Sequence, residues 1–362
     1  MTQKHAVKLK PGVISGKEYQ SLVANCKDEG YALAAVNVTS SSVLNAVLEA
    51  AASTKTDVIV QLSNGGAEFF AGKGMPDNQK AKVLGAVSAA QHVHLLAEHY
   101  GVCVVLHTDH ANKKLLPWID SLLLEGEKHY ERTGKPLFSS HMLDLSEETL
   151  DANIADCVRY IKRMSQIQVS LEIELGVTGG EEDGIGHDHD ASADNSKLYT
   201  QPEDVLKAFN ALNHLGHFSI AASFGNVHGV YKPGNVKLRP EILKNSQTLV
   251  ASTNKTATNP LNLVFHGGSG SEKEKIKEAI KYGVFKMNID TDTQFAYSQG
   301  AAQVIFDNPK AFKYQLDPES GVPYKKLYDP RAWQRAGEIS LKNRLIEAFQ
   351  DLGGLGKSLA HR

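Results

Sequence analysis

The chain has 362 residues, of which 41% are hydrophobic, enough for a large folded core and normal for an α/β barrel with insertions. Its 39 basic and 41 acidic residues give a formal net charge of −2, which argues against nucleic acid or an anionic membrane as the main partner. The three cysteines, Cys26, Cys103 and Cys157, are odd in number and widely spaced, which excludes a disulfide framework and favours a reducing compartment.

The N-terminal residues contain no apolar segment typical of a secretory signal. No stretch approaches 18 uninterrupted apolar residues, so we expect a cytoplasmic protein with no membrane partner. We find neither an internal repeat nor a separate second domain, and we therefore expect a single domain over residues 1–362.

Eight apolar, β-rich runs alternate along the chain with segments of helical character. The predicted strands are 32–38, 57–62, 102–107, 137–142, 168–174, 218–224, 261–265 and 284–289. The predicted helices between them are 41–53, 78–99, 115–133, 147–164, 202–212, a short one at 240–245, and 272–281. This alternation predicts a closed (β/α)8, or TIM, barrel, and a doubly wound open sheet is the alternative.

Three stretches depart from the simple repeat. Residues 178–196 are rich in glycine and acids and read as a long mobile loop, and residues 64–78 read as a second long loop. After the eighth strand we expect extra C-terminal helices: an amphipathic one near 293–306, a connector as far as Asp329, and a final helix. This tail exceeds what closes a barrel, so we expect part of it to cover the mouth or to contact a partner subunit.

Polar side chains recur where the predicted strands end. The third strand runs through Val104, Val105 and Leu106 and then leaves the core at Asp109 and His110. Barrel enzymes collect their working groups at the carboxyl ends of the strands, so we expect the equivalent residues to share one pocket. The others are Asn37, Gln61, Ser63, Glu172, Glu174, His228, His266, Asn288 and Asp290.

Three of these residues, His110, His228 and His266, are imidazoles from separate strand ends. Such a set fits a catalytic Zn²⁺ site with an open coordination position, although each histidine alone also fits a structural, hydrogen-bonded role. Glu174 is an additional candidate ligand or a partner for an imidazole N–H. Asp109 should point away from His110, because neighbours in an extended chain face opposite ways, and is better interpreted as a proton-transfer group.

Two glycine-containing segments, Gly225–Gly229 and His266–Ser271, are candidates for binding phosphate. Gly267–Ser269 and Asp290–Thr291 fall in the loops after the seventh and eighth strands, which hold phosphate in many barrels, while tight turns are the simpler interpretation. Lys232 adds a charge there or is a solvated surface lysine. Glu181 and Glu182 lie between glycines and act either as a carboxylate carried on a lid or as a solvated acidic turn.

Eight motifs resemble the metal-dependent class II fructose-bisphosphate aldolases, above all the dimeric subgroup of enteric bacteria and yeasts. The resemblance covers nearly the whole chain and is weakest at about 308–327. The motifs are NVTSSS (37–42), SNGGAEFFAGKG (63–74), VVLHTDHANKKLLPW (104–118), FSSHMLDLSEE (138–148), LEIELGVTGGEEDG (171–184), FGNVHGVYKPGNVKLRPEIL (224–243), VFHGGSGS (264–271) and NIDTDTQFAY (288–297).

The resemblance implies reversible cleavage of D-fructose 1,6-bisphosphate to dihydroxyacetone phosphate and D-glyceraldehyde 3-phosphate by a homodimer. It implies Zn²⁺ on His110, His228 and His266, with Glu174 as an alternative ligand. Asp109 would exchange the proton of the C4 hydroxyl, and Glu182 would act as acid and base at the dihydroxyacetone-phosphate carbon. The residues expected to bind substrate or its phosphates are Asn37, Ser63, Gly229, Lys232, Gly267, Ser269, Asn288, Asp290, Thr291 and, from the neighbouring subunit, Arg331.

A monovalent cation such as K⁺ or Na⁺ is implied near the backbone oxygens of Val227, Gly229, Gly267 and Ser269. The implied chemistry is physically consistent, because a Lewis acid stabilises the enediolate that is left when C3–C4 breaks. An imine mechanism is disfavoured, since Lys286 lies inside the eighth strand and Lys232 lies beyond the sixth. The alternatives are a tagatose-1,6-bisphosphate aldolase, a zinc hydrolase on a barrel, and a non-catalytic binding protein.

Overall fold

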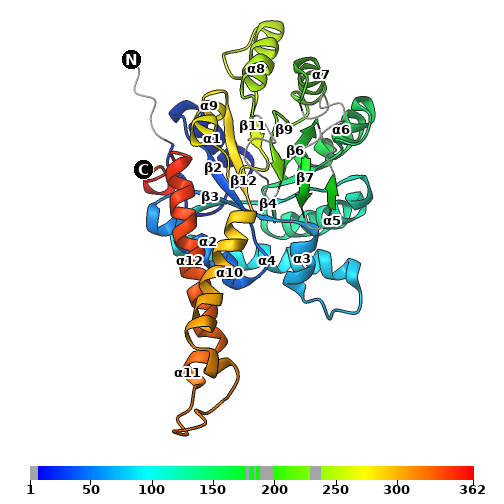
Figure 1. Cartoon of the computed structure of the whole chain (residues 1–362). Coiled ribbons are helices and arrows are strands. Elements are labelled where there is room, and N and C mark those ends of the chain that lie inside the picture. The colour runs from blue at the N-terminus through cyan, green and yellow to red at the C-terminus, as the bar shows by residue number, and fades with distance from the viewer. Residues whose placement is uncertain (1–6, 177–178, 183–184, 188–198, 229–237) are drawn as a thin grey trace.

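The computed structural model describes residues 7–176, 179–182, 185–187, 199–228 and 238–362, with the backbone alone described for 179–182, 185–187 and 227–228. Eight parallel strands form a closed ring (Figure 1), because β4 pairs with β3 on one side and with β5 on the other. In ring order the strands are β2 (Leu33–Asn37), β3 (Val58–Leu62), β4 (Cys103–Thr108), β5 (Ser140–Leu143), β6 (Ser170–Leu175), β9 (Phe218–Ala222), β11 (Leu263–Phe265) and β12 (Val284–Ile289). The predicted barrel is confirmed, and the open sheet is excluded.

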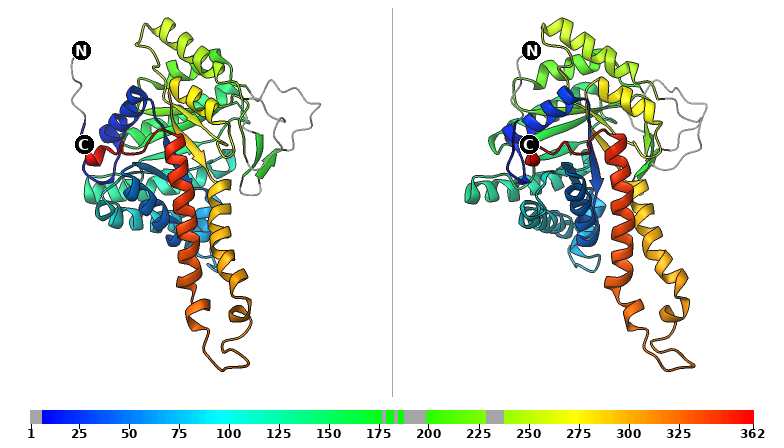
Figure 2. Two further views of the ribbon diagram at one scale, coloured as in Figure 1. Left: turned by 60° about the vertical axis from the view of Figure 1, so that its left-hand side comes forward. Right: turned by 90° about the vertical axis from the view of Figure 1, so that its left-hand side faces the viewer.

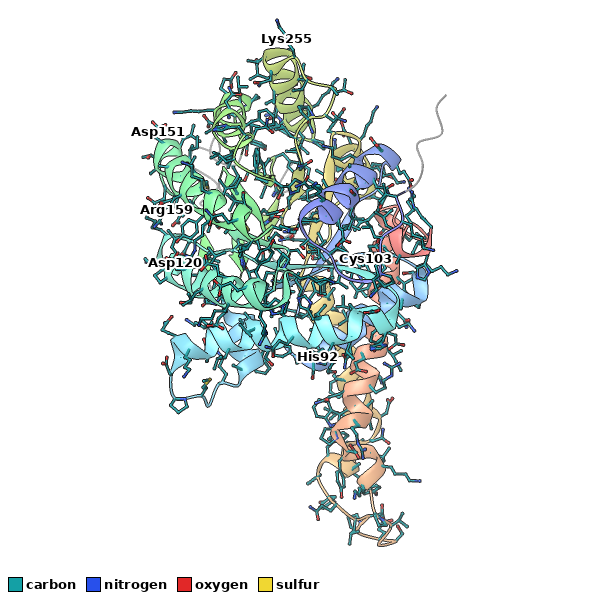
Figure 3. The ribbon with its side chains drawn as sticks, turned by 180° about the vertical axis from the view of Figure 1, so that it is seen from behind. His92, Cys103, Asp120, Asp151, Arg159 and Lys255 are labelled. Atoms are coloured by element: carbon teal, nitrogen blue, oxygen red, sulfur yellow. The ribbon has the colours of Figure 1, made fainter. Side chains whose placement is uncertain are left out.

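Helices surround the ring because each strand is buried on both faces and needs an apolar cover on its outer side. The helices that follow successive strands are α2 (Ser41–Thr54), α4 (Asn78–Tyr100), α5 (Leu116–Thr133), α6 (Leu150–Gln166), α7 (Pro202–Leu212), α8 (Glu241–Asn254), α9 (Lys273–Lys281) and α10 (Thr291–Asp307). Charged side chains lie on the outer side of α5 and α6, where Figure 3 shows Asp120, Asp151 and Arg159.

The predicted loop over 64–78 is wrong in its first half, which forms helix α3 (Asn64–Ala71). The hydroxyl of Ser63 caps this helix by accepting a hydrogen bond from the backbone N–H of Gly66 at 3.0 Å. The α3 helix packs tightly on α4, since a Cβ at Gly85 would lie 1.8 Å from the carbonyl oxygen of Ala67. The sequence did not predict this short helix, because its paired glycines, taken alone, indicate a turn.

The predicted 178–196 loop contains a hairpin. Strands β7 (Gly179–Glu182) and β8 (Ile185–His187) pair antiparallel, and β10 (Val227–His228) adds to β7 in parallel. Residues 178, 183–184 and 188–196 lie outside the described residues. The helix predicted at 240–245 continues to Asn254 as α8.

Two N-terminal elements, β1 (Gly12–Val13) and α1 (Gly16–Glu29), were not predicted. β1 pairs with the first residues of β4, Cys103 and Val104, at the amino end of the barrel. The buried face of α1 joins residues of the strands and of the C-terminal segment in a second apolar cluster, including Tyr19, Leu22, Val23, Leu33, Val105, Phe285 and Leu359. This end of the barrel is therefore filled by apolar side chains, which leaves the carboxyl end for the polar groups.

The C-terminal tail forms an arm. Helices α10 and α12 (Pro330–Asp351) lie side by side and project from the barrel, with α11 (Lys325–Tyr328) at the far end (Figures 1 and 2). The far end of the arm therefore extends away from the barrel, while α12 also packs against α2. Within the described ranges, no helix combines the length and the apolar character needed to cross a membrane.

Candidate active site

The carboxyl ends of the barrel strands bring together side chains that are distant in sequence. Asn37 ends β2, Asp109 follows β4, His266 follows β11 and Asn288 lies near the end of β12. All four residues are buried. The expectation that polar strand-end residues meet in one place is therefore confirmed for this set.

Three side-chain amides hold the carboxylate of Asp109. Asn37 and Gln61 donate to Oδ2 at 3.1 and 2.8 Å, and Asn288 donates to Oδ1 at 3.3 Å. Amides of this kind orient a carboxylate without exchanging protons with it. Gln61 was placed at a strand end but was not predicted as a site residue; its signal was a lone polar residue inside an otherwise apolar, buried strand.

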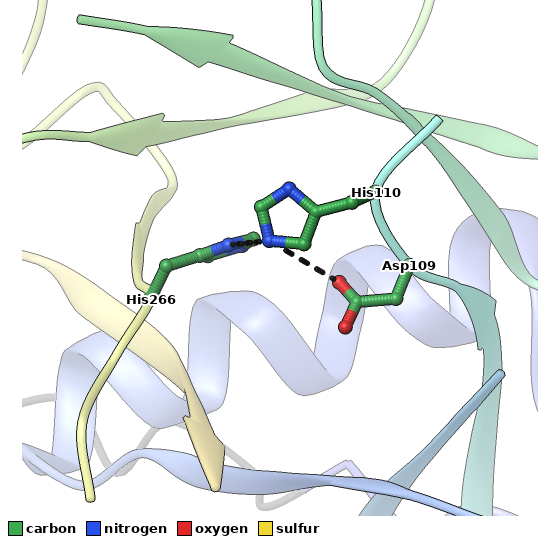
Figure 4. Close-up of side chains that lie close together, drawn as sticks. All are labelled: Asp109, His110 and His266. Atoms are coloured by element: carbon green, nitrogen blue, oxygen red, sulfur yellow. Dashed lines mark hydrogen bonds and ion pairs between the residues drawn. The ribbon is translucent and has the colours of Figure 1, made fainter. Parts of the chain in front are cut away.

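His110 and His266 meet beside Asp109 (Figure 4). Nδ1 of His266 lies 2.8 Å from Nε2 of His110, and Oδ1 of Asp109 lies 4.0 Å from the same Nε2. The expectation that Asp109 and His110 point apart is wrong. The alternation of side chains holds within a strand, and both residues follow the end of β4 at Thr108.

The second nitrogen of His110 faces two carboxylates. Its Nδ1 lies 2.9 Å from Oδ2 of Asp144 and 3.4 Å from Oε2 of Glu174. Burial alone would raise the pKa of Asp144, but its hydrogen bonds to His110 and Ser146 hold that pKa below its usual value. Asp144 was not predicted as a site residue, although it directly follows the strand β5, where an acid is a signal of the same kind as Asp109.

A buried network holds His266 from the other side. Nε2 of His266 lies 2.9 Å from Oε1 of Glu172, and Nζ of Lys286 lies 2.7 and 2.9 Å from the two oxygens of Glu172. Burial lowers the pKa of His266 to about 3, so this ring is neutral at physiological pH. Burial alone would raise the pKa of Glu172, but the Lys286 ammonium together with His107 and His266 holds it well below its ordinary value.

The donor atoms fit a divalent metal ion. One nitrogen or oxygen from each of Asp109, His110 and His266 lies within 4.8 Å of the others, and the same holds for His110, Asp144 and Glu174. Neutral imidazoles with flanking carboxylates are the donor set of catalytic zinc and similar first-row ions. The two groups share His110, so two adjacent positions for an ion are available.

The loops after β11 and β12 have the backbone features expected of phosphate-binding segments. Gly267 adopts a left-handed conformation with φ of 61°, and Gly268 donates its N–H to the carbonyl of Asn288 at 3.2 Å. A Cβ at Gly268 would lie 2.5 Å from Met287, so this close approach of the two loops requires glycine. Asp290 precedes α10, and Thr291 is its first residue.

Several predicted site residues cannot be placed by their side chains. Gly229 and Lys232 lie outside the described residues, and Val227, His228 and Glu182 are described by backbone alone. The pairing of β10 with β7 sets His228 opposite Gly180, two residues from Glu182. Arg331 is exposed and pairs with Asp329 at the start of α12, beside α11 at the far end of the arm, so it does not join the site of its own chain.

The fold and the site together define a barrel with a cluster of possible metal donors at the carboxyl ends of its strands. The family model for class II fructose-bisphosphate aldolase matches residues 17–357. The chain is 55% identical to the class 2 fructose-bisphosphate aldolase of Escherichia coli K12 over 352 residues, which cover 96% of this chain and 97% of that protein.

A solved structure agrees with these sequence matches. The 1.85 Å crystal structure of fructose-bisphosphate aldolase from Campylobacter jejuni is 52% identical, with a TM-score of 0.88 over 97% of this chain and 98% of that one. The chain belongs to the class II fructose-bisphosphate aldolase family. Enzymes of this family depend on a metal ion, in agreement with the clustered donors around His110.

Proposed function

We propose that the protein catalyses the reversible cleavage of D-fructose 1,6-bisphosphate to dihydroxyacetone phosphate and D-glyceraldehyde 3-phosphate in glycolysis and gluconeogenesis. The observation that carries this proposal is the convergence of His110, His266 and Asp109 at the barrel mouth in a chain of this family. The compartment is the cytoplasm, and residues 1–362 act as one domain.

The metal ion would be Zn²⁺, held by His110, His228 and His266, with Glu174 as an alternative ligand. Support comes from the neutral, buried ring of His266 and from the two overlapping donor groups around His110. A bound Zn²⁺ would supply Lewis-acid stabilisation of the negative charge that develops as C3–C4 breaks. The metal site lies next to Asp109, which places proton transfer and charge stabilisation on the same part of the substrate.

Asp109 takes the proton of the C4 hydroxyl during cleavage and returns it during synthesis. The amides of Asn37, Gln61 and Asn288 hold its carboxylate in one orientation, which is the arrangement that general acid–base catalysis needs. Glu182 performs the second proton transfer, at the dihydroxyacetone-phosphate carbon. Its strand β7 pairs with β10, which sets Gly180, two residues before Glu182, opposite His228.

One substrate phosphate, that of the dihydroxyacetone half, binds where the glycine-containing loops and the start of α10 present N–H groups. Asn37, Ser63 and Asn288 contact the sugar, while this phosphate rests on Gly229, Lys232, Gly267, Ser269, Asp290 and Thr291. The helix dipole of α10, a helix of 17 residues, favours an anion at Thr291. A monovalent cation, K⁺ or Na⁺, sits beside the backbone oxygens of Val227, Gly229, Gly267 and Ser269.

The protein works as a homodimer in which the arm contacts the partner subunit. Large apolar side chains are exposed along the arm, and Phe295 and Phe306 of α10 are 64% and 74% exposed. Large apolar side chains exposed along one part of a surface are typical of an interaction site. Arg331, at the end of the arm, binds the second substrate phosphate in the neighbouring site, since it is remote from the site of its own chain.

A coupled cleavage assay tests this function directly. The enzyme should release dihydroxyacetone phosphate from fructose 1,6-bisphosphate, lose this activity with a chelator and recover it with Zn²⁺ or Co²⁺. Faster turnover of tagatose 1,6-bisphosphate would move the assignment to that sugar. Activity that survives thorough metal removal, or trapping of substrate on the protein by borohydride, would refute the metal mechanism.

A further inference from the structure

An ion pair crosses the interior of the barrel directly beneath the site. Lys286 lies in the middle of β12 and Glu172 in β6, and neither side chain has more than 1% of its surface exposed. The ammonium contacts both carboxylate oxygens, at 2.7 and 2.9 Å. Buried pairs of this kind add little to stability, because desolvation of the two charges offsets their attraction. Stability alone therefore gives no reason for charges at these two positions.

The pair has a third member. Oε1 of Glu172 lies 2.9 Å from Nε2 of His266, and a carboxylate that is ionised can only accept a hydrogen bond. Nε2 of His266 therefore carries the proton, and Nδ1 carries the lone pair. That Nδ1 lies 2.8 Å from Nε2 of His110, on the side where the metal donors converge.

We propose that Glu172 and Lys286 are positioning residues that fix the tautomer and ring orientation of His266 for metal binding. This inference rests on the metal centre of the proposed function. Lys286 donates to both oxygens of the carboxylate, so that Glu172 presents a fixed acceptor to the ring. Carboxylate partners of metal-binding histidines commonly change metal affinity by 10- to 100-fold.

A purely structural role for the pair is the alternative, and the barrel offers a matched control. Asp57 is also a buried carboxylate, accepting hydrogen bonds from Ser358, Leu359 and the backbone of Cys103 at the amino end of the barrel. It lies at the opposite end from His266. Asp57→Asn should lower stability without changing metal affinity, whereas loss of the Glu172 carboxylate should change affinity.

The experiment compares Glu172→Gln, the charge-neutral double variant Glu172→Gln with Lys286→Met, and Asp57→Asn. Metal affinity is measured by competition between the apoenzyme and a chromogenic chelator for Zn²⁺ or Co²⁺, together with the Co²⁺ absorption spectrum and apoenzyme thermal unfolding. The double variant should have the melting temperature of the wild-type apoenzyme. It should bind metal about 10- to 100-fold more weakly than the wild type, with an altered Co²⁺ spectrum. Wild-type affinity and spectrum in the double variant would overturn the proposal.

A measurement on the unmodified protein decides the same point if the variants do not fold. ¹⁵N-histidine spectra of the apoenzyme, with His266 assigned by its loss in His266→Gln, report which ring nitrogen carries the proton. We expect the Nε2–H tautomer for His266, and an Nδ1–H tautomer would refute the inference. Neither measurement uses sugar cleavage, so an enzyme with another substrate would fail the proposed function while leaving this inference intact.

Discussion

The isosteric substitution Asp109→Asn separates proton transfer from the structural role of this side chain. The carboxylate accepts from Asn37, Gln61 and Asn288. An asparagine can keep its oxygen on Asn37 and Gln61, and its NH2 group can donate to Asn288 after that amide rotates. The rotation is available because Oδ1 of Asn288 has no hydrogen-bond partner among the described residues.

The expected effects on stability and on turnover differ in size. Three charge-assisted hydrogen bonds become neutral ones, a loss of about 1 kcal/mol each, while the variant no longer buries a charge, which returns several kcal/mol. We therefore expect the free energy of unfolding to change by less than about 2 kcal/mol. A general acid–base group contributes about 10²- to 10⁴-fold to the rate, so kcat should fall by that factor, equivalent to about 3–5 kcal/mol.

Turnover is measured by the coupled cleavage assay, and zinc content by elemental analysis of the same protein. Asp109→Asn should keep its zinc and its fold while losing activity. A kcat within tenfold of the wild type would refute the role of Asp109 in proton transfer. Loss of zinc would instead indicate that Asp109 is a metal ligand. Its carboxylate lies 4.0 Å from Nε2 of His110, so a small shift is enough for both side chains to contact one ion.

Three further predictions follow from other parts of the structure. Glu182→Ala should slow isotope exchange at the dihydroxyacetone-phosphate carbon by about 10²-fold or more, and Glu181→Ala, on the same strand β7, is the control that should lose far less. Phe306→Glu on the arm should convert dimers to monomers in light scattering, whereas Leu95→Glu, at a comparable 69% exposed position on α4, should leave the dimer intact. Burial lowers the pKa of His141 to about 3, below the unfolded value of about 6.5, so its neutral form favours the folded state above pH 6.5 and this contribution is lost as the pH falls. Urea unfolding at pH 7, 6 and 5 should show a loss of about 1.4 kcal/mol per pH unit below 6.5 from this residue, and His141→Gln should remove it; an unchanged slope would contradict the assignment.

The barrel could be predicted from the sequence because parallel strands that are buried on both faces consist of continuous apolar runs. The run around Val104 is one of eight that all became barrel strands. Short elements such as α3 have no comparable pattern in the sequence. The second and third residues of helix α3 are glycines, and its stability comes from packing on α4 at Gly85, a contact that no local pattern reveals.

Site residues could be predicted where their position at the end of a strand was enough to identify them. They could not be predicted where their role depends on a second side chain that is distant in sequence. Asp109, His110 and His266 follow strands and were found by that rule. Glu172 and Lys286 lie inside strands, where a single sequence cannot show that two buried charges face each other across the barrel. The orientation of Asp109 was predicted wrongly for a related reason, since the rule of alternation ends with the strand.

The two kinds of side chain in the site are distinguished by the chemistry of their partners. Asp109 is surrounded by amide donors, which hold a carboxylate but cannot take its proton, so that carboxylate keeps the capacity to exchange a proton with substrate. His110 and His266 each face carboxylate oxygens with one nitrogen, which directs the other nitrogen toward the shared space between them. Neighbouring residues on one strand end can therefore perform acid–base and metal-binding roles, because the barrel supplies amides to one and carboxylates to the other.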